Sequence, residues 1–190
     1  MSSLRAETFR SYALFGVVSI ILSIALMVLE GIVGAYVLPS IISAVFVLLI
    51  VIQTLGGVML LVGMLACARF VSDTKLYRVV QGIIVFSIVS CIYSIIAFMD
   101  PTRESLAAVT VILFVHGVLA IMFGVRIGTH AHVFGVYGKR IYRFSLISGI
   151  LMLIPFIDLV GALVSIVVHV YLILLMYAIA RKEVAVGLVD

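Results

Sequence analysis

The chain has 190 residues, of which 66% are hydrophobic and 11% are charged, and its formal net charge is +4. A soluble domain carries about 45–50% apolar and about 25% charged residues, so this composition excludes an ordinary soluble domain. The basic residues lie at the ends of long apolar runs, where they orient a membrane protein, so the positive charge does not indicate nucleic-acid binding. The sequence predicts an all-α, polytopic integral membrane protein that forms a single domain over residues 1–190.

Six transmembrane helices, arranged as three hairpins, account for the apolar runs. Runs of about 18 or more apolar residues are typical of membrane spans. Helices are expected because each backbone group within a bilayer must be satisfied inside its own segment. The first run is far longer than the core of a signal peptide, so we expect it to be retained. The predicted spans are 11–33, 41–67, 79–99, 106–125, 142–157 and 159–180.

The basic residues segregate to one side of this layout. That side holds Arg5, Arg10, Arg69, Lys75, Arg78, Arg126, Lys139, Arg140, Arg143, Arg181 and Lys182, and the other side holds only Arg103. Because cytoplasmic loops are enriched in Lys and Arg, both termini are predicted to be cytoplasmic, with the cell membrane as the expected location. The longest loop on this side is 126–143. Its cations Lys139, Arg140 and Arg143 are expected to contact anionic lipid headgroups or a partner protein.

The fifth predicted span is short. Its apolar part, 144–157, has 14 residues, or roughly 21 Å at about 1.5 Å per residue, against a hydrocarbon core of about 30 Å. Either the helix starts earlier, with Arg140 and Arg143 reaching the headgroups along their apolar stems, or the last hairpin is shallow.

The third and fifth spans align without gaps over 87–100 and 145–158. Two Ser positions, two Ile positions, a Phe and the final Asp are identical. If the outer turn of the second hairpin has five extra residues, His116 aligns with His169. Duplication of a hairpin and chance similarity between apolar helices both explain this pattern, since repeats are common in membrane transport folds.

Three polar residues fall near the middle of predicted spans: Gln53, His116 and His169. Ionisable residues at this depth are rare and usually face the protein interior. The two histidines can act as structural hydrogen-bonding groups, as a proton or substrate relay, or as axial ligands of a haem b. Gln53 can line a pore or bond to a neighbouring helix.

No motif in the sequence indicates catalysis. There is no Ser/His/Asp arrangement, HExxH, phosphate-binding Gly loop or CxxC, so we lean against an enzyme. His130 and His132 supply only two ligands, which is too few for a metal site, and no metal is expected. Glu30, Asp100 and Asp158 can be explained as solvated residues near the outer turns, although a cation site is an alternative.

Three functions remain open from the sequence. The leading hypothesis is a non-catalytic membrane protein, an accessory or structural subunit that packs against other membrane proteins or against copies of itself. Small residues at helical spacing on nearly every span favour this role. The second is a small transporter or channel whose path is lined by the midplane polar residues. The third is a redox subunit that carries a b-type haem or binds a quinone.

Overall fold

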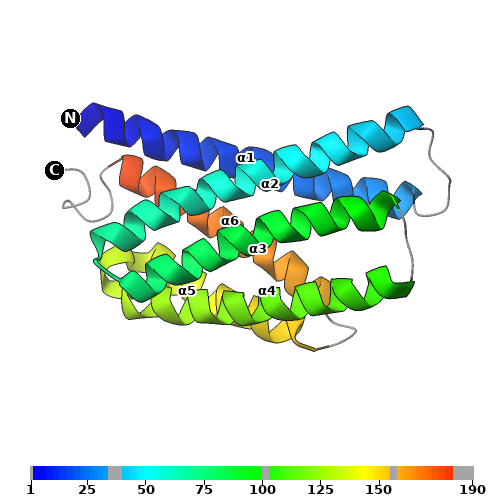
Figure 1. The fold of residues 1–190 in the computed structure, drawn as a ribbon. Coiled ribbons are helices and arrows are strands. Elements are labelled where there is room, and N and C mark those ends of the chain that lie inside the picture. The colour runs from blue at the N-terminus through cyan, green and yellow to red at the C-terminus, as the bar shows by residue number, and fades with distance from the viewer. Residues whose placement is uncertain (1, 34–39, 100–102, 155–157, 182–190) are drawn as a thin grey trace.

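The structure, a computed structural model, describes residues 2–33, 40–99, 103–154 and 158–181. These residues form an all-helical bundle (Figure 1). Its helices, in chain order, are α1 (Ser2–Val33), α2 (Ser40–Phe70), α3 (Thr74–Met99), α4 (Arg103–Thr129), α5 (Ala131–Met152) and α6 (Asp158–Ala180). The predicted all-α fold class is confirmed.

Five of the helices in the described residues are long and apolar enough to cross a membrane. They are α1, α2, α3, α4 and α6, whose apolar segments run over Ala6–Leu29, Ala44–Phe70, Thr74–Ile96, Thr110–Thr129 and Val160–Ala180. A multi-pass membrane protein is therefore compatible with the fold, and a membrane location is plausible.

The fifth helix differs in its bounds from the predicted span 142–157. It covers Ala131–Met152, which agrees with the alternative that the helix starts earlier and includes Arg140 and Arg143. It is not among the helices that could span a membrane by length and composition. The predicted long loop 126–143 is correspondingly helical, apart from a tight turn at His130 between α4 and α5. Residues 155–157 lie outside the described residues.

Two features explain how α5 differs from the prediction. Its middle carries Lys139, Arg140 and Arg143, which lower its hydropathy. These cations alternate with the buried residues Gly138, Ile141 and Ser145, so the helix is amphipathic there and packs against the bundle without being apolar throughout. A bend occurs at Gly135, where φ is 60° and ψ is −140°, a conformation that only glycine adopts readily.

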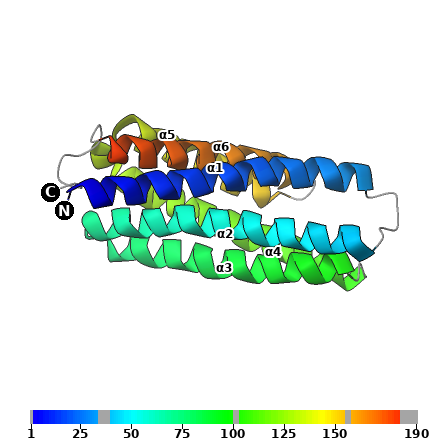
Figure 2. The same cartoon turned by 90° about the horizontal axis from the view of Figure 1, so that it is seen from above.

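The bundle has two distinct ends. Helix α1 begins and α6 ends at the same end, which also holds the turns between α2 and α3 and between α4 and α5 (Figures 1 and 2). We call this the basic end, because the described cations Arg10, Arg69, Lys75, Arg78, Arg126, Lys139, Arg140, Arg143 and Arg181 lie on the helix segments that meet there. Of the outer carboxylates considered from the sequence, Asp100 and the side chains of Glu30 and Asp158 lie outside the described residues.

The main hydrophobic core lies toward the basic end. Leu60, Met64, Leu76, Ile127 and Ile179 are fully buried there and come from α2, α3, α4 and α6. A much smaller cluster, Leu26, Phe46 and Ile50, joins α1 to α2 farther from that end. The most extensive helix contacts are those of α4 with α5, α5 with α6, and α1 with α2. The large apolar side chains that remain exposed on the outer surface suit a lipid environment.

Candidate functional site

A central cavity of about 400 Å³ lies between the helices, and all six contribute to its wall. Its lining includes eight serines, Thr54, Gln53, His116 and His169, together with aliphatic side chains and Phe123. The lining serines are Ser19, Ser23, Ser87, Ser90, Ser94, Ser145, Ser148 and Ser165. None of the lining residues in the described part of the chain is Asp, Glu, Lys or Arg. The interior therefore combines polar side chains with a larger apolar surface and carries no fixed formal charge.

The three midplane residues singled out in the sequence share this cavity. Gln53 reaches it from α2, His116 from α4 and His169 from α6. Their common position is a finding of the structure, whereas any role as a relay, substrate contact or haem ligand stays a prediction.

Local hydrogen bonds fix both histidines. The Nδ1 atom of His169 lies 2.8 Å from the carbonyl oxygen of Ser165, four residues earlier in α6. His116 bonds to the backbone of Ile112, also four residues earlier in its helix. The His116 ring also packs edge-on against Phe86 of α3, with ring centroids 4.9 Å apart. Each imidazole is thus oriented by its own helix.

Gln53 joins α1 to α2. Its Nε2 donates to the hydroxyl of Ser23 at 2.8 Å, and its backbone carbonyl accepts a hydrogen bond from Ser19 at 2.9 Å. The Ser23 hydroxyl in turn donates to the carbonyl of Ser19. Close approach of the helices makes these bonds possible, because a Cβ added to Gly56 would lie 2.7 Å from the carbonyl oxygen of Phe15. Gln53 therefore links two helices and also lines the cavity.

Both aligned segments contribute serines to the cavity wall. Ser87 and Ser90 of α3 line it, and so do their counterparts Ser145 and Ser148 of α5. The sequence analysis assigned small residues at helical spacing to helix packing, and several of the lining serines belong to that set. Their recurrence at one face of several helices was the signal for a polar interior, but it cannot by itself separate a cavity from a tight contact.

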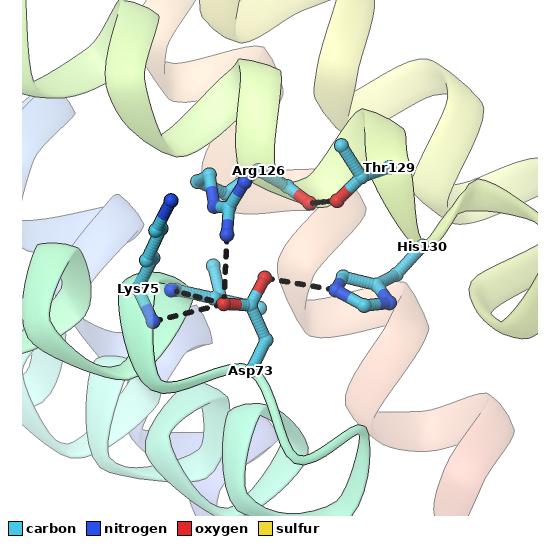
Figure 3. A network of polar contacts seen from close by, with 6 residues as sticks. Asp73, Lys75, Arg126, Thr129 and His130 are labelled. Atoms are coloured by element: carbon cyan, nitrogen blue, oxygen red, sulfur yellow. Dashed lines mark hydrogen bonds and ion pairs between the residues drawn. The ribbon is translucent and has the colours of Figure 1, made fainter.

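A second polar site, a network of contacts around Asp73, lies at the basic end (Figure 3). The sequence analysis did not single out Asp73. Asp73 follows α2 and caps α3: its Oδ1 accepts hydrogen bonds at 2.9 Å from the backbone N–H groups of Lys75 and Leu76. The same oxygen pairs with Arg126 at 3.0 Å, and Oδ2 lies 2.8 Å from Nε2 of His130. One carboxylate thereby ties the α2–α3 turn to the α4–α5 turn.

The electrostatics of Asp73 follow from these contacts. Burial by itself raises the pKa of a carboxyl group, and the Asp73 side chain is only 7% exposed. The hydrogen bonds from Leu76, His130 and Arg126 and the charge of Arg126 outweigh burial and lower its pKa from 3.8 to about 2. A sequence signal existed, since Asp directly before an apolar helical run is a typical N-cap.

The remaining predicted contacts lie outside the cavity. Lys139, Arg140 and Arg143 are exposed on α5. Arg140 donates to the hydroxyl of Tyr171 at 3.1 Å and lies over its ring, which stacks on Phe144. Contact of these cations with lipid headgroups or a partner stays a prediction.

His130 and His132 lie near each other, but the described residues contain no group of three or more potential metal ligands.

The two cysteines are free and separate. Cys67 is buried in α2 near the basic end, and Cys91 lies in α3 beside the cavity.

No known protein family matches this chain, and no curated protein or solved structure is significantly similar to it. Function must therefore be inferred from the site alone.

Proposed function

We propose that this protein is an integral membrane protein that binds a small solute in the central cavity and passes it across the bilayer. Gln53, His116 and His169 are proposed contact residues. The cavity carries this proposal: polar side chains from six helices surround a space of about 400 Å³, which lies within the 300–1,000 Å³ typical of small-molecule sites. Polar groups at membrane depth that face a cavity usually mark a substrate path.

The proposed path also has an orientation. We place the basic end at the cytoplasmic face of the cell membrane, because the positive-inside rule assigns Lys- and Arg-rich ends to that side. Both chain termini are then cytoplasmic. In this orientation the exposed cations of α5 lie at the depth of the anionic lipid headgroups, with which we propose they interact.

The role of an accessory subunit is the second candidate. It is favoured by the small residues at close helix contacts, such as Gly117 of α4 against Gly149 of α5. These contacts lie within one chain, however, and need no partner to form. We therefore place this role behind solute passage.

A b-type haem or quinone role is supported less well. His116 and His169 would supply the axial ligands, and the iron would supply one-electron chemistry. Eight serines in the wall suit a hydrogen-bonding solute better than the apolar faces of a porphyrin. A spectrum of the purified protein tests the haem version, since bound haem b gives a strong Soret band.

Replacing both histidines tests solute passage. In proteoliposomes subjected to an osmotic step, reswelling measures entry of erythritol, urea, alanine or the anion erythronate. We expect at least one of these solutes to enter faster than in protein-free liposomes. The double variant His116→Leu/His169→Leu should slow that entry by about ten- to thirty-fold, the effect of losing two hydrogen bonds.

The matched control is His132→Leu, which replaces an exposed histidine outside the cavity with the same residue. It should leave entry unchanged. Equal entry with and without protein for the whole panel would contradict the proposed function, and so would entry that the double variant does not alter.

A further inference from the structure

We infer that the solute taken by the central cavity is an uncharged compound with several hydroxyl groups. This inference rests on the proposed function and adds the chemical class of the substrate. It comes from the direction of each hydrogen bond that the lining side chains already make, because those directions determine which donors and acceptors are left for a ligand.

Five lining serines have already donated their protons to backbone carbonyls. The bonds run from Ser19 to Gln53, from Ser23 to Ser19, from Ser90 to Phe86, from Ser148 to Gly161 and from Ser165 to Ala162, at 2.7–2.9 Å. A hydroxyl has one proton and two lone pairs, so each of these serines can offer a ligand only lone pairs. This part of the wall requires donors on the solute.

The histidine of α6 adds another acceptor. A carbonyl oxygen can only accept, so the short contact between His169 Nδ1 and the Ser165 carbonyl places the proton on Nδ1. In the neutral imidazole, Nε2 then carries a lone pair and accepts from a ligand. His116 bonds to the backbone of Ile112 in the same i to i−4 pattern, so one of its ring nitrogens donates to that carbonyl and the other keeps a lone pair for a ligand.

Ser145, in contrast, offers a proton and so requires an acceptor on the solute. It is 1% exposed, it lines the cavity, and its hydroxyl has no hydrogen-bond partner in the protein. A buried hydroxyl without a partner costs free energy, so a ligand group that reached it from the cavity would gain a hydrogen bond that the protein does not supply. Its proton is free to be donated. The solute must therefore accept hydrogen bonds as well as donate them.

Charge narrows the class further. The described lining residues include no Asp, Glu, Lys or Arg to neutralise an ion. An unpaired charge in a low-dielectric interior is strongly disfavoured, so anions and ammonium groups fit poorly. The hydroxyl group donates and accepts without charge, and the aliphatic residues between the polar ones, such as Leu61 and Leu119, suit a carbon skeleton. A small polyol meets all of these requirements.

Osmotic reswelling of proteoliposomes tests the class with three four-carbon probes. Erythritol is the neutral polyol, erythronate the corresponding anion and putrescine a dication. We expect erythritol to enter at least ten-fold faster than either ion, after subtraction of the rate in protein-free liposomes. Faster or equal entry of erythronate or putrescine overturns the substrate class but leaves the proposed passage standing. No entry of any probe, together with no entry of urea or alanine, overturns the proposed function itself.

The variant Ser145→Ala tests the contact. Because the hydroxyl has no partner in the protein, its removal should leave the thermal unfolding temperature unchanged or slightly raised. Entry of erythritol should fall about five-fold, the effect of one neutral hydrogen bond. The matched control, Ser11→Ala, removes an exposed hydroxyl outside the cavity and should leave entry unchanged. Unaltered erythritol entry in Ser145→Ala, in protein that unfolds normally, contradicts the inference.

Discussion

The carboxylate of Asp73 holds three parts of the basic end together. It caps the start of α3, and it pairs with Arg126 at the end of α4 and with His130 in the α4–α5 turn. A folded-state pKa near 2, below the ordinary 3.8, means that folding favours the ionised form. The carboxylate therefore stabilises the fold above about pH 4, and this contribution is lost as the pH falls toward 2. After allowance for solvent screening at the rim of the bundle, it amounts to about 1–2 kcal/mol.

Replacing Asp73 with Asn removes the charge and keeps the shape. Asp73→Asn should lower the free energy of unfolding in detergent by about 1–2 kcal/mol at pH 7, and the difference from the wild type should shrink as the pH falls from 5 to 2. Circular dichroism during thermal unfolding over this pH range measures it. Glu7→Gln, at an exposed position on α1, is the control. A difference that is constant from pH 7 to pH 2 would show that the charge of Asp73 has no role.

Glycines set the spacing of the helices in the most closely packed pair. A Cβ on Gly149 of α5 would lie 2.6 Å from the carbonyl oxygen of Gly117 in α4 and 3.0 Å from the backbone nitrogen of Ile121. Backbone atoms cannot move aside as a flexible side chain can. The α4–α5 contact, and with it the position of Ser145 and Ser148 in the cavity wall, therefore depends on small residues.

Gly149→Ala should consequently separate α4 from α5. We expect a loss of about 1–3 kcal/mol in the free energy of unfolding, as found for overpacked interiors. Gly82→Ala is the matched control, because its Cβ would meet only a Leu119 methyl group at 3.8 Å. In a helix, that substitution should be neutral or stabilise by up to about 1 kcal/mol. Thermal unfolding of both variants measures the two effects. Equal stabilities of Gly149→Ala and Gly82→Ala would contradict the close contact between α4 and α5.

At the scale of the whole molecule, the proposed orientation can be tested directly. In a background with Cys67 and Cys91 replaced by Ser, we consider two single cysteines at exposed positions, Thr74→Cys near the basic end and Met99→Cys near the opposite end. A membrane-impermeant maleimide should label Met99→Cys in intact cells and Thr74→Cys only after permeabilisation, because the positive-inside rule places the basic end in the cytoplasm. Labelling in the reverse pattern would invert the proposed topology.

The oligomeric state separates the first two candidate functions. Solute passage through a cavity lined by one chain requires no partner, whereas an accessory subunit requires one. We expect native mass measurement in mild detergent to find a single chain that still takes up erythritol after reconstitution. Stable association with another membrane protein, and no uptake without it, would favour the accessory role.

The sequence by itself determined the class of fold. Long uncharged runs can satisfy their backbone only as helices, so the bounds of α2, α3, α4 and α6 differ from the prediction by a few residues and follow from composition. For α5 the sequence left two alternatives open, and the structure has the earlier start, because a helix that packs one face on neighbours does not need to be apolar throughout. Only the tertiary structure decided that Gln53, His116 and His169 share a cavity and that Asp73 joins two turns. Linear spacing gives the depth of a residue along its helix, but which way its side chain faces depends on how the helices pack.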